Sequence, residues 1–201
     1  MLNARAVQAL VVYGPMLRQL VEFRFAQHVV KVTPELNSSA IEQSVAAHLF
    51  DHERAMPNRA LRQELVELQE GRCFYTGEHL TRWSLDHVLP WVMLRESSLT
   101  NFVMTSPSIN SKKQGLLLSP EPLRTWANHV LSRLPQLEQL STAFGWEWEP
   151  DANVRALRAF YARYPNGIPL WSVETNVSAL DSNSRSAALD TLDRLLEGIA
   201  S

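Results

Sequence analysis

The sequence changes character at Gly71, and this change limits the possible folds of the chain more than any other feature. Before it, apolar residues recur at the spacing of an amphipathic helix, for example at Leu61, Leu65 and Leu68. After it comes "GRCFYTGEHL", a short, aromatic and turn-rich segment without helical periodicity. The chain is therefore predicted to carry a unit of a different kind within an otherwise helical protein.

Helical periodicity covers most of the chain on both sides of this unit. Two helices are predicted between Ala4 and Val32, with a break at Gly14-Pro15. The pair Ser119-Pro120 marks another helix start. Further helices are predicted over 41–50, 58–70, 121–134, 151–165 and 189–198. We therefore expect a mainly α chain in which 1–69 and 119–201 are helical regions.

The segment between these regions predicts two strands followed by a helix. "RWSLDHV" and "NFVMTS" are candidates for short strands. "SPSINSKKQG" then fits a helix, with Ser106 as N-cap, Pro107 in the first position and Gly115 as the stop. We expect a strand–strand–helix unit over 70–118.

Four polar residues with chemical potential fall within this unit: Asp86, His87, Asn101 and Asn110. Asp86 and Asn110 offer oxygen ligands of the kind that Mg²⁺ prefers. His87 suits a general base, because the ordinary pKa of histidine lies near neutrality. Lys113 follows Asn110 by three residues and so shares its helical face.

Simpler interpretations stand beside each of these. Asp86-His87 taken alone fits a polar strand end, and Asn110 fits an exposed helix position. Lys112 and Lys113 are candidates for DNA contact, but a solvated helix face explains them equally well. Adjacent residues on a regular strand also point to opposite faces, so Asp86 and His87 serve one phosphate only if the strand bends there.

Taken together, "CFYTGEHL", "WSLDHVLPW" and "NFVMTSPSINSKKQGLL" resemble the motif of the HNH endonucleases, the ββα-metal nucleases. That family's pattern is Asp-His, a proline shortly after, Asn or His opening the second strand, and Asn or His on the helix followed by lysine. The spacing is similar to that of the HNH domain of the RNA-guided CRISPR endonuclease. Outside 70–118 there is only a loose likeness to bacterial stand-alone HNH proteins. The resemblance implies a mainly α fold with a small ββα-metal (HNH) insert.

The resemblance also implies a role for each matched residue. His87 would deprotonate the attacking water, and Asn101 would fix the loop that aims it. Asp86 and Asn110 would hold one divalent metal, Mg²⁺ or Mn²⁺. An enzyme of this kind hydrolyses DNA phosphodiester bonds, and one such site cuts one strand, so nicking is expected.

The sequence departs from the family at the zinc knuckle that many members carry. Cys73 is the single cysteine, and Thr76 stands where its partner would be. A tetrahedral structural zinc site needs four ligands, so structural zinc is not expected. Aromatic residues are expected to fill the space instead, namely Phe74, Tyr75, Trp83 and Trp91.

The charge and cysteine content bear on partners and location. The formal net charge is −2, whereas nucleic-acid-binding domains usually carry a basic excess. Intrinsic DNA affinity is therefore expected to be weak, and a partner protein that delivers or activates the enzyme is a reasonable expectation. A single cysteine fits a reducing, cytoplasmic compartment, and neither a signal peptide nor a membrane span is predicted. The resemblance suggests anti-phage defence or restriction as the context.

A second hypothesis remains open. The chain could be a catalytically inactive HNH-like module that binds DNA or another protein, and the lost zinc knuckle favours this alternative. The acidic C-terminal segment, with an amphipathic "LDTLDRLLEG", is interpreted mainly as a packing helix. A role in opposing phosphate approach is the alternative for that helix.

Overall fold

The computed structural model describes residues 14, 21, 56–91, 93 and 97–201. The chain divides into two compact units, 1–55 and 56–201, and the elements described here belong to the second. The helices predicted between Ala4 and Val32 and over 41–50 lie outside the described residues, except that Gly14 and Val21 are helical.

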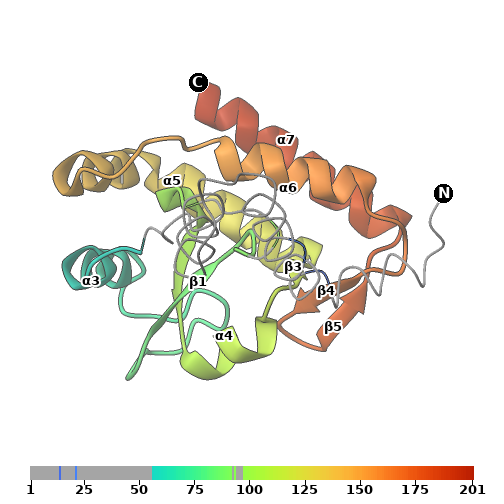
Figure 1. Ribbon diagram of the computed structural model, residues 1–201, viewed down its shortest axis with the longest axis horizontal. Helices are drawn as coiled ribbons and strands as arrows, with labels where there is room; N and C mark the ends of the chain where they lie inside the picture. The colour runs from blue at the N-terminus through green and yellow to red at the C-terminus, as the bar shows by residue number, and fades with distance from the viewer. Residues whose placement is uncertain (1–13, 15–20, 22–55, 92, 94–96) are drawn as a thin grey trace, which may run out of the picture. The chain divides into compact units, whose positions relative to one another are not determined.

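The described part of the chain is mainly helical, as predicted, with two small sheets (Figure 1). None of its helices is long and apolar enough to cross a bilayer. The elements in chain order are α3 (Arg59–Leu68), β1 (Ser84–His87), the 3-10 helix η2 (Leu99–Asn101), β2 (Phe102–Thr105), α4 (Pro107–Lys113), β3 (Leu117–Leu118), α5 (Pro120–Phe144), α6 (Ala152–Arg163), β4 (Pro169–Ser172), β5 (Asn176–Ala179) and α7 (Ser182–Ala200).

The two strands predicted between 70 and 118 form an antiparallel pair. Asp86 on β1 lies opposite Val103 on β2, and His87 lies opposite Phe102. Asn101 was expected to open the second strand. It is instead the last residue of η2, directly before β2. The chain therefore enters β2 through a tight turn that fixes Asn101 beside the end of β1.

Helix α4 follows β2 and packs against β1. Its start is as predicted: the Ser106 hydroxyl accepts from the Ile109 amide at 3.3 Å, and Pro107 occupies the first helical position. The helix ends at Lys113, and the next residue, Gln114, has a positive φ of 51°. The stop is thus made by Gln114, one residue before the predicted Gly115.

Helix α5 extends well beyond its prediction. It begins at Ser119-Pro120 as expected, but it continues through Pro135 to Phe144. Its second half carries Leu137 into a core shared with α3 and the β1–β2 pair. The buried members of this core are Leu61, Leu65, Val66, Leu85, Leu99, Phe102, Met104 and Leu137.

Helix α7 packs on α5 and α6, and Figure 1 shows α6 and α7 side by side. It begins at Ser182, within the Ser/Asn-rich stretch that the sequence analysis left outside the helix. The cause is a capping box, in which Asp181 accepts from the Ser184 amide at 2.7 Å and its own amide donates to the Ser184 hydroxyl at 2.8 Å. Leu192 and Leu195 are fully buried, which confirms the packing interpretation of this helix.

Gly198 on α7 lies against Leu131 of α5. A Cβ atom at this position would lie 2.5 Å from Leu131 Cδ2, so the leucine side chain would have to move to make room for one.

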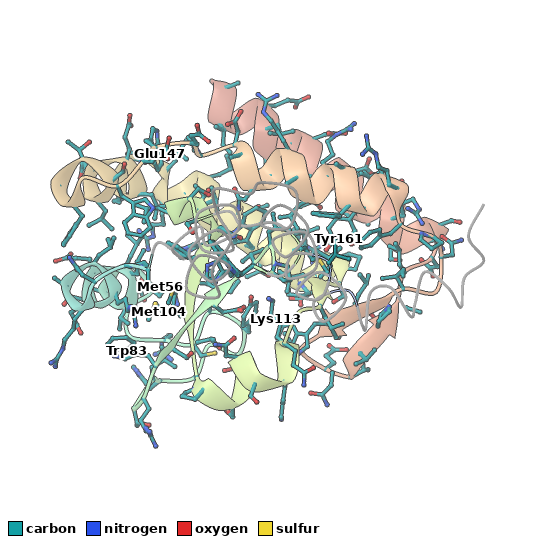
Figure 2. All side chains as sticks on the ribbon, viewed as in Figure 1. Met56, Trp83, Met104, Lys113, Glu147 and Tyr161 are labelled. Carbon is teal, nitrogen blue, oxygen red and sulfur yellow. The ribbon has the colours of Figure 1, made fainter. Side chains whose placement is uncertain are left out.

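A three-stranded sheet was not predicted. β3 pairs in parallel with β4, and β4 pairs antiparallel with β5. β3 follows α4 directly, and the Tyr161 hydroxyl of α6 donates to the carbonyl of Leu118 on β3 (Figure 2). The sheet thereby fixes the chain just after α4 to the C-terminal helices.

Candidate active site

The two residues of the Asp-His pair point to different neighbours. The carboxylate of Asp86 meets α4 and Tyr75. The ring of His87 packs on Phe102, with centroids 4.9 Å apart, and on Trp91 at 5.7 Å. Both residues lie within the regular strand β1, so the alternation of a strand separates their side chains.

Asp86 is the centre of a buried polar network. Its side chain accepts a 2.6 Å hydrogen bond from the Tyr75 hydroxyl at Oδ2. The Lys113 ammonium lies 3.1 Å from Oδ2 and 3.3 Å from Oδ1. The Asp86 carboxylate is thus engaged by one neutral donor and one cation, as buried charges in proteins generally are.

Tyr75 is a member of this network that the sequence analysis assigned only to apolar filling. Its hydroxyl is buried, and burial together with the negative charge of Asp86 raises the pKa of Tyr75 well above its ordinary value. Tyr75 therefore stays a neutral hydrogen-bond donor to Asp86. Its ring also packs edge-on against Trp171 at 4.7 Å, which fixes the direction of the hydroxyl.

Helix α4 is fastened to β1 by two side chains. The Asn110 amide nitrogen donates to the Ser84 hydroxyl at 2.8 Å and to the Leu85 carbonyl at 3.1 Å. One turn later, Lys113 donates to the His87 carbonyl at 2.8 Å as well as to Asp86. The structure therefore brings Asn110 and Lys113 to successive positions along β1, with Asp86 beside Lys113.

Asn101 clamps the chain that leaves β1. Its side-chain oxygen accepts from the Leu89 amide at 2.7 Å, and its side-chain nitrogen donates to the Leu89 carbonyl at 3.1 Å. Its own carbonyl accepts from the Val88 amide at 2.9 Å. Asn101 is fully buried, so these bonds fix the two residues that follow His87. The resemblance implies a loop-fixing role for Asn101, and that role stays a prediction.

Replacing Asn101 with alanine is expected to lower the free energy of unfolding by about 2–4 kcal/mol, because both polar groups of Leu89 would lose a buried partner. Urea unfolding followed by circular dichroism measures this change. Asn128→Ala, at an exposed position of α5, is the matched control and should alter stability by less than about 0.5 kcal/mol. Equal stability of the two variants would contradict the clamp.

The two candidate DNA-contacting lysines differ in accessibility. Lys112 is exposed on α4. Lys113, labelled in Figure 2, is fully buried and points from α4 toward β1. In this arrangement Lys112 can present its ammonium to a phosphate, whereas Lys113 acts on Asp86 and on the backbone of His87.

The donor chemistry of Asp86 and Asn110 fits a hard divalent cation, because one offers a carboxylate and the other an amide oxygen. The described residues contain no cluster of three or more His, Cys, Asp or Glu side chains that could hold a metal. Mg²⁺ commonly uses only one or two protein ligands and keeps its waters. The cation that lies beside Asp86 in this structure is the Lys113 ammonium.

Cys73 lies next to β2. Its side chain is buried, and its sulfur lies 3.1 Å from the Thr105 hydroxyl oxygen. It packs beside β2 as a small side chain, in keeping with the common behaviour of free cysteine.

Comparison with models of known protein families finds no match for this chain. The likeness to HNH endonucleases therefore rests on the individual residues of 70–118 and on the positions that they occupy.

Proposed function

We propose that this chain is an HNH endonuclease that hydrolyses DNA phosphodiester bonds with the help of one divalent metal, Mg²⁺ or Mn²⁺, and that it nicks one strand. The observation that carries the proposal is the convergence of Asp86, Asn101 and Asn110 on one short strand and its exit. They are brought there by two antiparallel strands and the helix that follows. Asn110 thus holds the strand before His87 at Leu85, and Asn101 holds the chain after it at Leu89.

His87 is the general base in this proposal. Its backbone is held on both sides, by Lys113 at its own carbonyl and by Asn101 at Leu89. A histidine whose backbone is held in a fixed position suits the removal of a proton from water. His87 is only 3% exposed, and the half-buried Trp91 packs edge-to-face on its ring. We therefore expect Trp91 to move aside when substrate and water reach His87.

Asp86 and Asn110 are the residues that would hold the metal. When bound, a divalent cation there would neutralise negative charge on the scissile phosphate. Lys112, exposed on the same helix, would add a contact to the DNA backbone.

The alternative function is a catalytically inactive HNH-like module that binds DNA or another protein. Two observations favour it. Asp86 already has a buried cationic partner in Lys113, 3.1 Å away. β1 is also regular at Asp86 and His87, so their side chains leave opposite faces of the strand. In this alternative the ion pair is a permanent part of the core, and the scaffold serves binding alone.

The wider context of the proposal rests on the resemblance and on composition. DNA is the proposed partner, and the net charge of −2 supports help from a second protein in delivery or activation, because binding to DNA phosphates draws on several lysines or arginines. A cytoplasmic role in anti-phage defence or restriction is proposed on the same basis.

Supercoiled plasmid tests the two functions against each other. The full chain should convert it to the open-circular form with Mg²⁺ or Mn²⁺ and leave it intact with a chelator. Folded protein that nicks neither plasmid nor single-stranded DNA with either metal would refute the nuclease and leave the binding module.

A further inference from the structure

The Lys113–Asp86 pair is unusual in its degree of burial. Lys113 is among the largest fully buried side chains of the described residues, and Asp86 is 5% exposed. The ammonium has two acceptors, the Asp86 carboxylate and the His87 carbonyl at 2.8 Å. The pair is therefore satisfied internally and does not depend on solvent.

The position of Lys113 on its helix adds to this stability. It is the last residue of α4, where the negative end of the helix dipole favours a cation. The ammonium itself contacts the Asp86 carboxylate and the His87 carbonyl. A single replacement of this residue would remove both contacts.

A metal ion at Asp86 would compete with this ammonium. The ammonium lies within 3.3 Å of both carboxylate oxygens, and a divalent cation binds carboxylate oxygens at a similarly short range. Two cations so close in a buried setting repel strongly, because little solvent screens them. A metal therefore gains Asp86 only if Lys113 withdraws.

We infer that Lys113 sets the metal affinity of this site: its ammonium occupies the cation position at Asp86, and Mg²⁺ or Mn²⁺ binds there by displacing it. This inference rests on the proposed metal site of the nuclease. It assigns to Lys113 a positioning role at the carboxylate, in place of the DNA contact for which the sequence made it a candidate. The lysine keeps Asp86 ordered when metal is scarce and raises the metal concentration that the site needs.

The experiment measures Mn²⁺ binding to the full chain without DNA, by the loss of the free-Mn²⁺ paramagnetic resonance signal. Lys113→Met removes the charge at similar length, and Lys113→Gln removes it while keeping a hydrogen-bond donor. Both are expected to bind Mn²⁺ about 10- to 100-fold more tightly than the wild type, the range typical for residues that tune a metal ligand. Lys112→Met, one residue away and exposed, should bind like the wild type.

Thermal unfolding supplies a second measurement. Lys113→Met leaves the Asp86 carboxylate buried without its cation, so its melting temperature should be low without metal and should rise steeply with Mn²⁺. The double variant Asp86→Asn/Lys113→Met should show no such rise, because the carboxylate is gone. If Lys113→Met is unfolded without metal, Mn²⁺ should fold it.

The inference is overturned if both Lys113 variants bind Mn²⁺ no more tightly than the wild type, whether that binding is measurable or absent. An unfolded Lys113→Met chain that Mn²⁺ fails to fold overturns it as well. Tight Mn²⁺ binding by the variants together with no nicking by the wild type would refute the nuclease alone. Nicking by the wild type with unchanged Mn²⁺ affinity in the variants would refute the role of Lys113 alone.

Discussion

Replacing His87 with glutamine is expected to lower the rate of plasmid nicking by about 10²–10⁴-fold, the usual contribution of a general base. Glutamine keeps a polar side chain of moderate size between Trp91 and Phe102, the two rings that pack on His87. The change therefore removes the proton acceptor with less disturbance of the packing than alanine would cause. Initial rates of open-circle formation at saturating metal measure the effect.

The control for this experiment is His79→Gln. His79 lies in the turn-rich segment before β1 and is exposed, so its replacement should leave the nicking rate within about twofold of the wild type, as is usual for exposed sites without a role. Melting temperatures of both variants should lie close to that of the wild type. A folded His87→Gln protein that nicks at the wild-type rate would remove His87 from the catalytic assignment.

Deleting residues from Leu180 onward is expected to abolish cooperative folding of 56–201. Leu180 is 1% exposed, and its backbone pairs with Gly167 and Ile168 at 2.7 Å and 2.8 Å. The deletion also removes Leu192 and Leu195 from the core. Each buried leucine contributes about 2–5 kcal/mol, so the loss is comparable with the 5–15 kcal/mol that holds a typical domain folded. Circular dichroism and thermal melting report the outcome.

Point changes on α7 separate packing from charge. Leu192→Ala should cost about 2–5 kcal/mol, whereas Glu197→Ala at an exposed position of the same helix should cost less than about 0.5 kcal/mol. A truncated chain that melts at the wild-type temperature would show that α7 is dispensable. The truncation does not test whether the acidic charges of α7 oppose phosphate approach, because it also removes part of the core.

Local sequence signals identified the elements that surround the candidate site. Ser106-Pro107 and Ser119-Pro120 marked the starts of α4 and α5 correctly, because cap and first-turn preferences are properties of a few adjacent residues. The β1–β2 pair and α4 were predicted from short composition cues and are confirmed. The role of the unit as an HNH nuclease stays a prediction.

The elements that the sequence analysis missed depend on distant partners. β3 has only two residues, and its strand geometry comes from pairing with β4, some fifty residues later in the chain. Helix α5 passes through Pro135 because the residues beyond it bury Leu137 against another part of the chain. Tertiary packing outweighs local propensity in such cases.

The same distinction applies within the candidate site. The identities of Asp86, Asn101 and Asn110 were visible in the sequence, and their positions around β1 follow from the strand–strand–helix order. The burial of Lys113 was not visible, because the sequence places it on the same helical face as Asn110 but does not say whether that face is packed or solvated. Tyr75 was likewise recognised as aromatic but not as the donor to Asp86.

The long helix α5 limits how this protein can be dissected. Its Trp126 donates to the carbonyl of Thr100 at 2.9 Å, while Leu137 on the same helix packs in the core with Phe102 and Met104. A fragment cut at the boundaries of the motif, 70–118, would leave these side chains of the hairpin facing water. We therefore do not expect 70–118 to fold alone. Variants that test the proposed site have to retain α3 and α5, which pack against β2 and η2.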